Sequence, residues 1–229
     1  MANASIVGYG CRQTMTVGNT PATGGQSEFL VQGGAAPGAT VAIFKGSPVA
    51  MQTAAAPGQL GFIQDASALA MTDTIQGGVA WSHARANTNK VLGIFNGATF
   101  VDASGKPSWT NGLIAAQTSS TDYNTGNNNI TAFVNTNPAQ EYTVRADAAL
   151  TNASFNTLTN TGFNLNSVGA GVSGQSDSTL NLNGVATTGV LNYMWKVVRS
   201  ANVENQKDFL VAGADVVVSY NPQANQYQA

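Results

Sequence analysis

The chain has 229 residues, with 9 basic and 11 acidic side chains and a formal net charge of −2. Charged residues make up 9% of it, against about 25% in an ordinary soluble domain, and about two dozen each of asparagine and threonine take their place. This composition excludes a basic nucleic-acid-binding surface, and no run approaches the roughly 20 apolar residues of a transmembrane helix. The opening residues lack a basic n-region and a long apolar h-region, so we expect no signal peptide.

The N-terminal third predicts an extended arm followed by short strands. Residues 1–26 are rich in glycine and threonine with few apolar anchors, which is typical of an arm. Short apolar runs follow, separated by Gly and Pro turn signals, as in a barrel or sandwich. They cover residues 27–32, 40–44 and 48–51.

The middle of the chain carries the sharpest turn signals. Asn96-Gly97 separates two apolar runs and predicts a tight hairpin, because both residues tolerate a positive φ. The segment 102–107 predicts a second hairpin loop. Further strands are expected at 79–81, 91–95, 98–101, 130–134 and 140–145.

The C-terminal part contains an unusual uncharged segment. Residues 148–195 hold a single charged side chain, Asp177, among Asn, Thr, Ser, Gly and Leu. We interpret this segment as a polar β excursion from the core, with a long loop as the alternative. Strands are expected at 193–199 and 214–220, and short helical turns at 67–71 and 148–150.

Together these elements predict one all-β domain over residues 27–229, a compact barrel or sandwich of short antiparallel strands. The extended N-terminal arm of residues 1–26 precedes this domain, and the excursion at about 148–195 leaves it.

Motifs for catalysis or cofactors are weak. One cysteine, Cys11, and one histidine, His83, are too few for a structural zinc site. The segment 169–174 fits the GxGxxG pattern, but no helix is expected after it, as a nucleotide site requires. The segment 122–133 resembles the front of a calcium loop, yet Phe133 stands where a bidentate glutamate is needed. We therefore expect no metal, no cofactor and no enzymatic activity.

The segment 90–109 nevertheless has a specific pattern, KVLGIFNGATFVDASGKPSW, and residues 130–147 have a second, ITAFVNTNPAQEYTVRAD. Both resemble segments of the capsid cement, or head decoration, proteins of tailed bacteriophages. The resemblance covers about residues 80–150, and both ends of the chain fit more loosely. Two departures fall in expected loops, where Thr110-Asn111-Gly112-Leu113 replaces a second tryptophan element and Asn135 or Asn137 replaces an aspartate.

The resemblance implies a structural protein that binds the outside of a phage head at capsomer seams, with the major capsid protein as partner. Its location would be the outer surface of the virion, after synthesis in the bacterial cytoplasm. Uncharged amides and hydroxyls suit such an interface because they avoid the cost of desolvating charges. We expect self-association as a homotrimer, with a dimer as the alternative, and neither nucleic acid nor membrane as partner. The candidate capsid or subunit contacts are Ile6, Val7, Tyr9, Trp109, Tyr142 and Trp195.

Two other hypotheses remain open from the residues alone. Polar loops at 119–129 and 173–189 would suit a carbohydrate-binding or host-attachment module, recognisable by a shallow surface site with exposed aromatic rings. A hydrolase using a pair of the scattered carboxylates is the third hypothesis, although no particular pair stands out. Aromatic residues such as Tyr142 and Trp195 could also serve the core alone.

Overall fold

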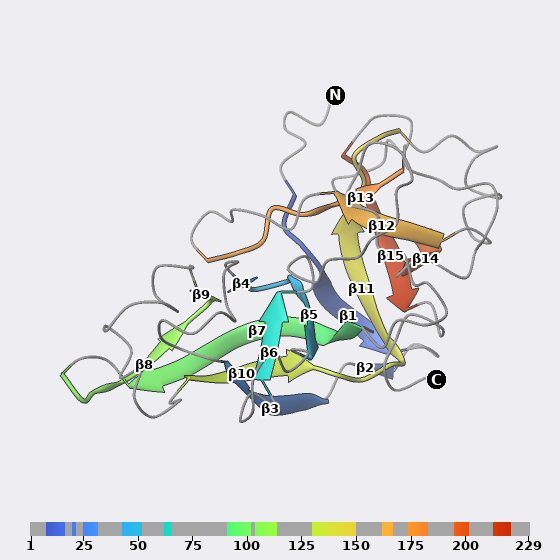
Figure 1. Ribbon diagram of the computed structural model, residues 1–229. Coiled ribbons are helices and arrows are strands. Elements are labelled where there is room, and N and C mark those ends of the chain that lie inside the picture. The colour runs from blue at the N-terminus through green and yellow to red at the C-terminus, as the bar shows by residue number, and fades with distance from the viewer. Residues whose placement is uncertain are drawn as a thin grey trace.

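The computed structural model is built entirely of β-strands in the part of the chain that it describes (Figure 1). The described residues are 8–16, 20–21, 25–31, 43–51, 62–65, 91–101, 104–113, 130–149, 162–166, 174–182, 195–201 and 213–220. The expected all-β class is confirmed for these residues. Of the two expected helical turns, 67–71 and residue 150 lie outside them, whereas 148 lies in a bend and 149 has no regular structure.

One sheet has seven strands in the order β13-β12-β14-β15-β11-β1-β2, and all its pairings are antiparallel. Its centre is formed by the strands β11, β14 and β15, which are rich in the β-branched and aromatic residues that favour strands. The seven strands are β1 (Arg12–Thr16), β2 (Thr20–Pro21), β11 (Gln140–Arg145), β12 (Gly162–Asn166), β13 (Thr179–Asn181), β14 (Trp195–Ser200) and β15 (Asp215–Tyr220).

The other large sheet curls on itself. Its order is β10-β3-β6-β5-β7-β8, and β10 also pairs with β7, which closes five strands into a ring. Among its described strand pairs, only β3 and β6 run parallel. The six strands are β3 (Gln26–Val31), β5 (Pro48–Met51), β6 (Phe62–Asp65), β7 (Val91–Val101), β8 (Pro107–Thr110) and β10 (Ile130–Asn135), and a separate pair joins β4 (Ile43–Phe44) to β9 (Gly112–Leu113).

The predicted hairpin at Asn96-Gly97 is wrong. Strand β7 continues through both residues for 11 residues, and its pairing with β10 shifts by one position there, with Phe133 opposite Gly97 and Val134 opposite Phe95. Asn96 is thus the extra residue of a β-bulge, which uses the positive φ of Gly97 to bend the strand. The hairpin lies at the second predicted turn, where β7 and β8 pair from Val101 and Pro107.

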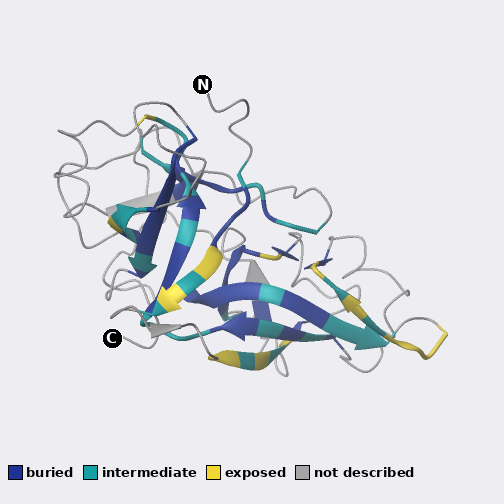
Figure 2. Cartoon of the chain, turned by 180° about the vertical axis from the view of Figure 1, so that it is seen from behind, coloured by how far each residue is buried: buried dark blue, intermediate teal, exposed yellow. Residues whose placement is uncertain are grey.

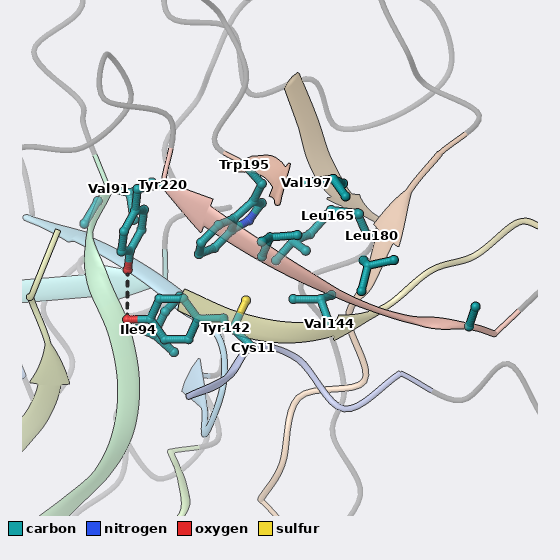
Figure 3. Close-up of a cluster of buried hydrophobic side chains, with 14 residues drawn as sticks. Cys11, Val91, Ile94, Tyr142, Val144, Leu165, Leu180, Trp195, Val197 and Tyr220 are labelled. Carbon is teal, nitrogen blue, oxygen red and sulfur yellow. Dashed lines mark hydrogen bonds between the residues drawn. The ribbon is translucent and has the colours of Figure 1, made fainter. Parts of the chain in front are cut away.

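Two hydrophobic clusters lie on the two sides of β7. Inside the curled sheet, Leu92 and Phe95 pack with residues of the surrounding strands. On the other side, Val91 and Ile94 pack against the seven-stranded sheet (Figure 3). The long strand β7 therefore joins the two sheets, because its side chains enter both clusters.

The polar segment 148–195 and the N-terminal segment both contribute strands to the seven-stranded sheet. Leu165 of β12 and Leu180 of β13 are buried in its cluster, so the described strands of the segment 148–195 extend the sheet at its β14 side. At the other side, β1 pairs with β11. The leucines of this uncharged segment thus fill the core. Its amide and hydroxyl side chains hydrogen-bond to backbone groups, as Gln175 does with the carbonyl of Tyr9 and Ser176 with the N–H of Ser178.

Candidate functional site

The predicted contact residues fall in three different environments. Tyr142 and Trp195 are buried, at 1% and 0% exposure, and pack edge-on with ring centroids 5.5 Å apart (Figure 3). Both rings fill the core, which was the alternative interpretation of these aromatic residues. They are therefore inaccessible to a partner that binds the folded protein. Ile6 and Val7 lie outside the described residues.

Tyr9 is also buried, beside a cluster of charges. The guanidinium carbon of Arg12 lies 4.0 Å from the centre of its ring, and that of Arg145 lies 5.1 Å away. Arg145 also forms an ion pair with Asp215 at 3.2 Å. Burial, followed by the charge of Asp215 and a hydrogen bond to it, raises the pKa of Tyr9 above its usual range. Tyr9 therefore remains a neutral phenol that anchors two arginines.

Trp109 is the exposed member of the predicted set. It lies on β8 and remains 51% exposed, on a strand that Figure 2 shows as partly exposed. Its indole rests on Gly97, where a Cβ atom would approach Trp109 Cζ2 to 2.2 Å, and its ring centroid is 5.3 Å from that of Phe133. Gly97 and Phe133 thus support a tryptophan that solvent still reaches.

Trp109 belongs to a row that crosses four strands. Leu30 of β3 pairs with Thr131 of β10, Thr131 pairs with Thr99 of β7, and Thr99 pairs with Trp109. Leu30 is 41% exposed at the far end of the row. We call this row, together with Phe133, the aromatic face. An exposed tryptophan and an exposed leucine on one face of a sheet are typical of a surface that binds a partner.

A second feature is a pocket of about 490 Å³ between the two large sheets. Arg12, Lys45, Asn96, Asn111 and Gln175 are among its lining residues. Among the described residues that line it there is no carboxylate, so this part of the lining is cationic and rich in amides.

Several other titratable groups are held in the core or in ion pairs. Burial raises the pKa of the Cys11 thiol and, with the influence of Tyr220, that of Tyr142. Glu141 is held 2.6 Å from Arg199. Within the described ranges, no three His, Cys, Asp or Glu side chains cluster as a metal site would, and no helix is long and apolar enough to cross a membrane.

Most other motif residues lie outside the described part of the chain. These are His83, the segments 119–129 and 122–129, and all of the glycine motif except Gly174. In the expected sugar-binding loop 173–189, Ser176 and Ser178 are buried and hydrogen-bond to each other at 2.8 Å. Phe133, at the expected glutamate position of the calcium pattern, lies on β10.

No protein-family model, curated protein or solved structure matches this chain.

The pocket is the feature that sequence reasoning missed. Its cations and amides come from segments far apart in the chain, such as Arg12, Asn96 and Gln175, so no local motif unites them. The one available signal was that two expected loop positions, Asn111 and Asn135, carry amides.

Proposed function

We propose that this protein is a capsid decoration protein of a tailed phage, which binds the outer surface of the head through its aromatic face. The resemblance over residues 80–150 motivates this proposal, and its strands β7, β8 and β10 form most of that face. The major capsid protein is the proposed partner, and the virion surface is the proposed location.

The exposed Trp109 is the observation that carries the proposal. A half-exposed tryptophan held by Gly97 and Phe133 has little rotamer freedom to lose on binding. Tryptophan is also enriched among the residues that dominate binding energy at protein interfaces. Thr99 and Thr131 beside it offer hydroxyls without a charge to desolvate.

Self-association as a homotrimer, or alternatively a dimer, completes the proposal. In the described part of the chain, β2, β8 and β13 are edge strands of their sheets. Such strand edges can pair with a neighbouring sheet through main-chain hydrogen bonds. A closed cyclic unit would bury these edges between identical subunits.

The test is rebinding of the protein to heads from which it has been stripped, using the particles with which it co-purifies. We expect Trp109→Ala to weaken attachment roughly 30-fold, as for an interface residue worth about 2 kcal/mol. Co-sedimentation gives the affinity, and cryo-electron microscopy of the decorated heads gives the bound face and the number of subunits.

Val198→Ala is the matched control, because Val198 is an exposed apolar residue of β14 in the other sheet. It should attach as the unmodified protein does. Equal attachment of the Trp109→Ala and Val198→Ala proteins would refute the aromatic face as the contact. The absence of ordered protein on any head lattice would refute the decoration role itself.

A further inference from the structure

We infer that the pocket between the sheets binds a small acidic sugar of the uronic acid class. Asn111 of this pocket accepts a hydrogen bond from Trp109 Nε1, but Trp109 itself does not line the pocket, and the inference does not depend on capsid attachment. It rests on three observations: a buried amide N–H without a partner among the described residues, two cations without a carboxylate partner in the same part of the chain, and a wall fixed by backbone contacts.

The unsatisfied amide is that of Asn135, which lines the pocket and is 2% exposed. Its Oδ1 accepts a hydrogen bond from the backbone N–H of Asn137 at 3.1 Å, which sets the orientation of the amide group. Its Nδ2 has no partner within the described residues. A buried N–H donor without a partner costs about 1–3 kcal/mol, so a ligand acceptor at this position would recover that energy.

The cations are Arg12 and Lys45, whose side chains are exposed at the pocket. Neither forms an ion pair with a carboxylate of the described residues. Arg12 lies over the ring of Tyr9, which orients a guanidinium while leaving its edge to donate hydrogen bonds. Two cations beside a pocket whose described lining holds no carboxylate favour an anionic ligand, and a carboxylate accepts their hydrogen bonds well.

The amides around the cations offer both donors and acceptors. Asn111 uses Oδ1 to accept from Trp109 Nε1 at 3.2 Å, and its Nδ2 has no bond to another described residue and can serve as a donor. Gln175 uses Nε2 to donate to the carbonyl of Tyr9 at 3.2 Å, and its Oε1, with no bond in the described part of the chain, can serve as an acceptor. Hydroxyl groups both donate and accept, so a polyhydroxylated ring matches this mixture better than an aliphatic acid does.

The wall of the pocket is fixed before any ligand arrives. Cys11 donates its backbone N–H to the carbonyl of Gly46 at 3.0 Å, and a Cβ at Gly10 would lie 2.8 Å from that carbonyl oxygen. The backbone N–H of Lys45 bonds to the carbonyls of Asn111 and Gly174 at 2.8 and 3.0 Å. A pocket of about 490 Å³ falls in the range of small-molecule sites, and a backbone wall that is already in place lowers the ordering cost of binding.

The experiment is a titration of the ¹⁵N-labelled full chain with D-glucuronate, D-glucose and acetate, followed by NMR. We expect saturable shifts with glucuronate, including the side-chain NH₂ signals of Asn135, and much weaker binding of the other two compounds. Lys45→Gln and Arg12→Gln should each weaken glucuronate binding roughly tenfold, as loss of a charge-assisted hydrogen bond does. Lys106→Gln, in the exposed turn between β7 and β8, is the matched control and should leave binding unchanged.

Each opposite result overturns the inference in a specific way. Equal binding of glucose refutes recognition of the carboxylate, and equal binding of acetate refutes recognition of the sugar. An equal loss in the Lys106→Gln protein refutes the location, and the absence of shifts with all three compounds refutes the site. Attachment to heads is measured separately through Trp109, so failure of one proposal leaves the other standing.

Discussion

At the scale of single residues, the contact between Gly97 and Trp109 determines whether the aromatic face exists. Gly97 has a φ of 130°, a conformation that side-chain-bearing residues rarely adopt. The space that its Cβ would need is filled by the indole of Trp109. One glycine therefore both permits the bulge in β7 and leaves room for the exposed ring to pack directly on this strand.

We therefore expect Gly97→Ala to lower the free energy of unfolding by about 2–4 kcal/mol, because backbone strain adds to overpacking. Urea unfolding measures this change. Gly105→Ala is the matched control, since Gly105 also has a positive φ, 82°, but has no atom near its Cβ position. It should cost about 1 kcal/mol from strain alone. Equal losses for the two variants would show that the contact with Trp109 contributes nothing.

At the scale of elements, β1 is the strand whose role differs most from the expectation. The composition of residues 1–26 predicts an arm, yet β1 pairs with β11, and Tyr9 and Cys11 just before it are buried. The Gln140 side chain adds a bond to the carbonyl of Met15 at 2.8 Å. Removing β1 would expose the β11 edge of the sheet and part of its core.

Deletion of residues 1–20 should accordingly lower the free energy of unfolding by at least about 3 kcal/mol, the burial energy of a tyrosine and a cysteine. Hydrogen exchange should be faster at those alternate amides of β11 (Gln140–Arg145) whose N–H groups point toward β1 rather than β15. Amides of β10 in the curled sheet provide the internal comparison. Unchanged stability after the deletion would mean that this segment is a detachable arm.

At the scale of the whole molecule, the cluster beneath the seven-stranded sheet holds neutral acids in an apolar environment. Tyr220 donates to the hydroxyl of Tyr142 at 3.4 Å, as the dashed line in Figure 3 marks. Burial raises the pKa of Tyr220, Tyr142, Tyr9 and Cys11 above their usual values. In the unfolded chain these groups ionise at about pH 8.5 for cysteine and about pH 10 for tyrosine.

These shifts predict a loss of stability at alkaline pH. Below about pH 8 the four groups are protonated in both the folded and the unfolded chain, so their ionisation does not change the free energy of unfolding. Above their ordinary pKa values only the unfolded chain loses these protons, so stability falls as the pH rises toward the raised values. The decrease should reach about 1.4 kcal/mol per pH unit for each group that has ionised in the unfolded chain.

Urea unfolding from pH 7 to 11 measures this decrease. The Cys11→Ala protein should begin its decline about one pH unit higher, because only the tyrosines remain. A flat stability profile up to pH 11 would contradict neutral burial of these groups.

Local sequence patterns determined the all-β class and many strand positions of this protein. The expected strands at 48–51 and 140–145 coincide with β5 and β11, because alternating or continuous apolar runs are set by neighbours in the chain. The same local patterns wrongly predicted a turn at Asn96-Gly97. In the structure, pairing with β10 keeps β7 continuous, and Asn96 becomes the extra residue of a bulge. Local patterns also left β1, β12 and β13 unassigned, because their pairing depends on distant strands.

The two candidate sites depended still more on the tertiary structure. The sequence singled out Trp109, Tyr142 and Trp195 alike as aromatic residues, and only packing separated an exposed ring from two buried ones. The pocket joins Arg12, Lys45 and Asn135 across the gap between two sheets. Composition and local periodicity determine which strands can form, whereas burial and the meeting of distant side chains depend on how the sheets pair and pack.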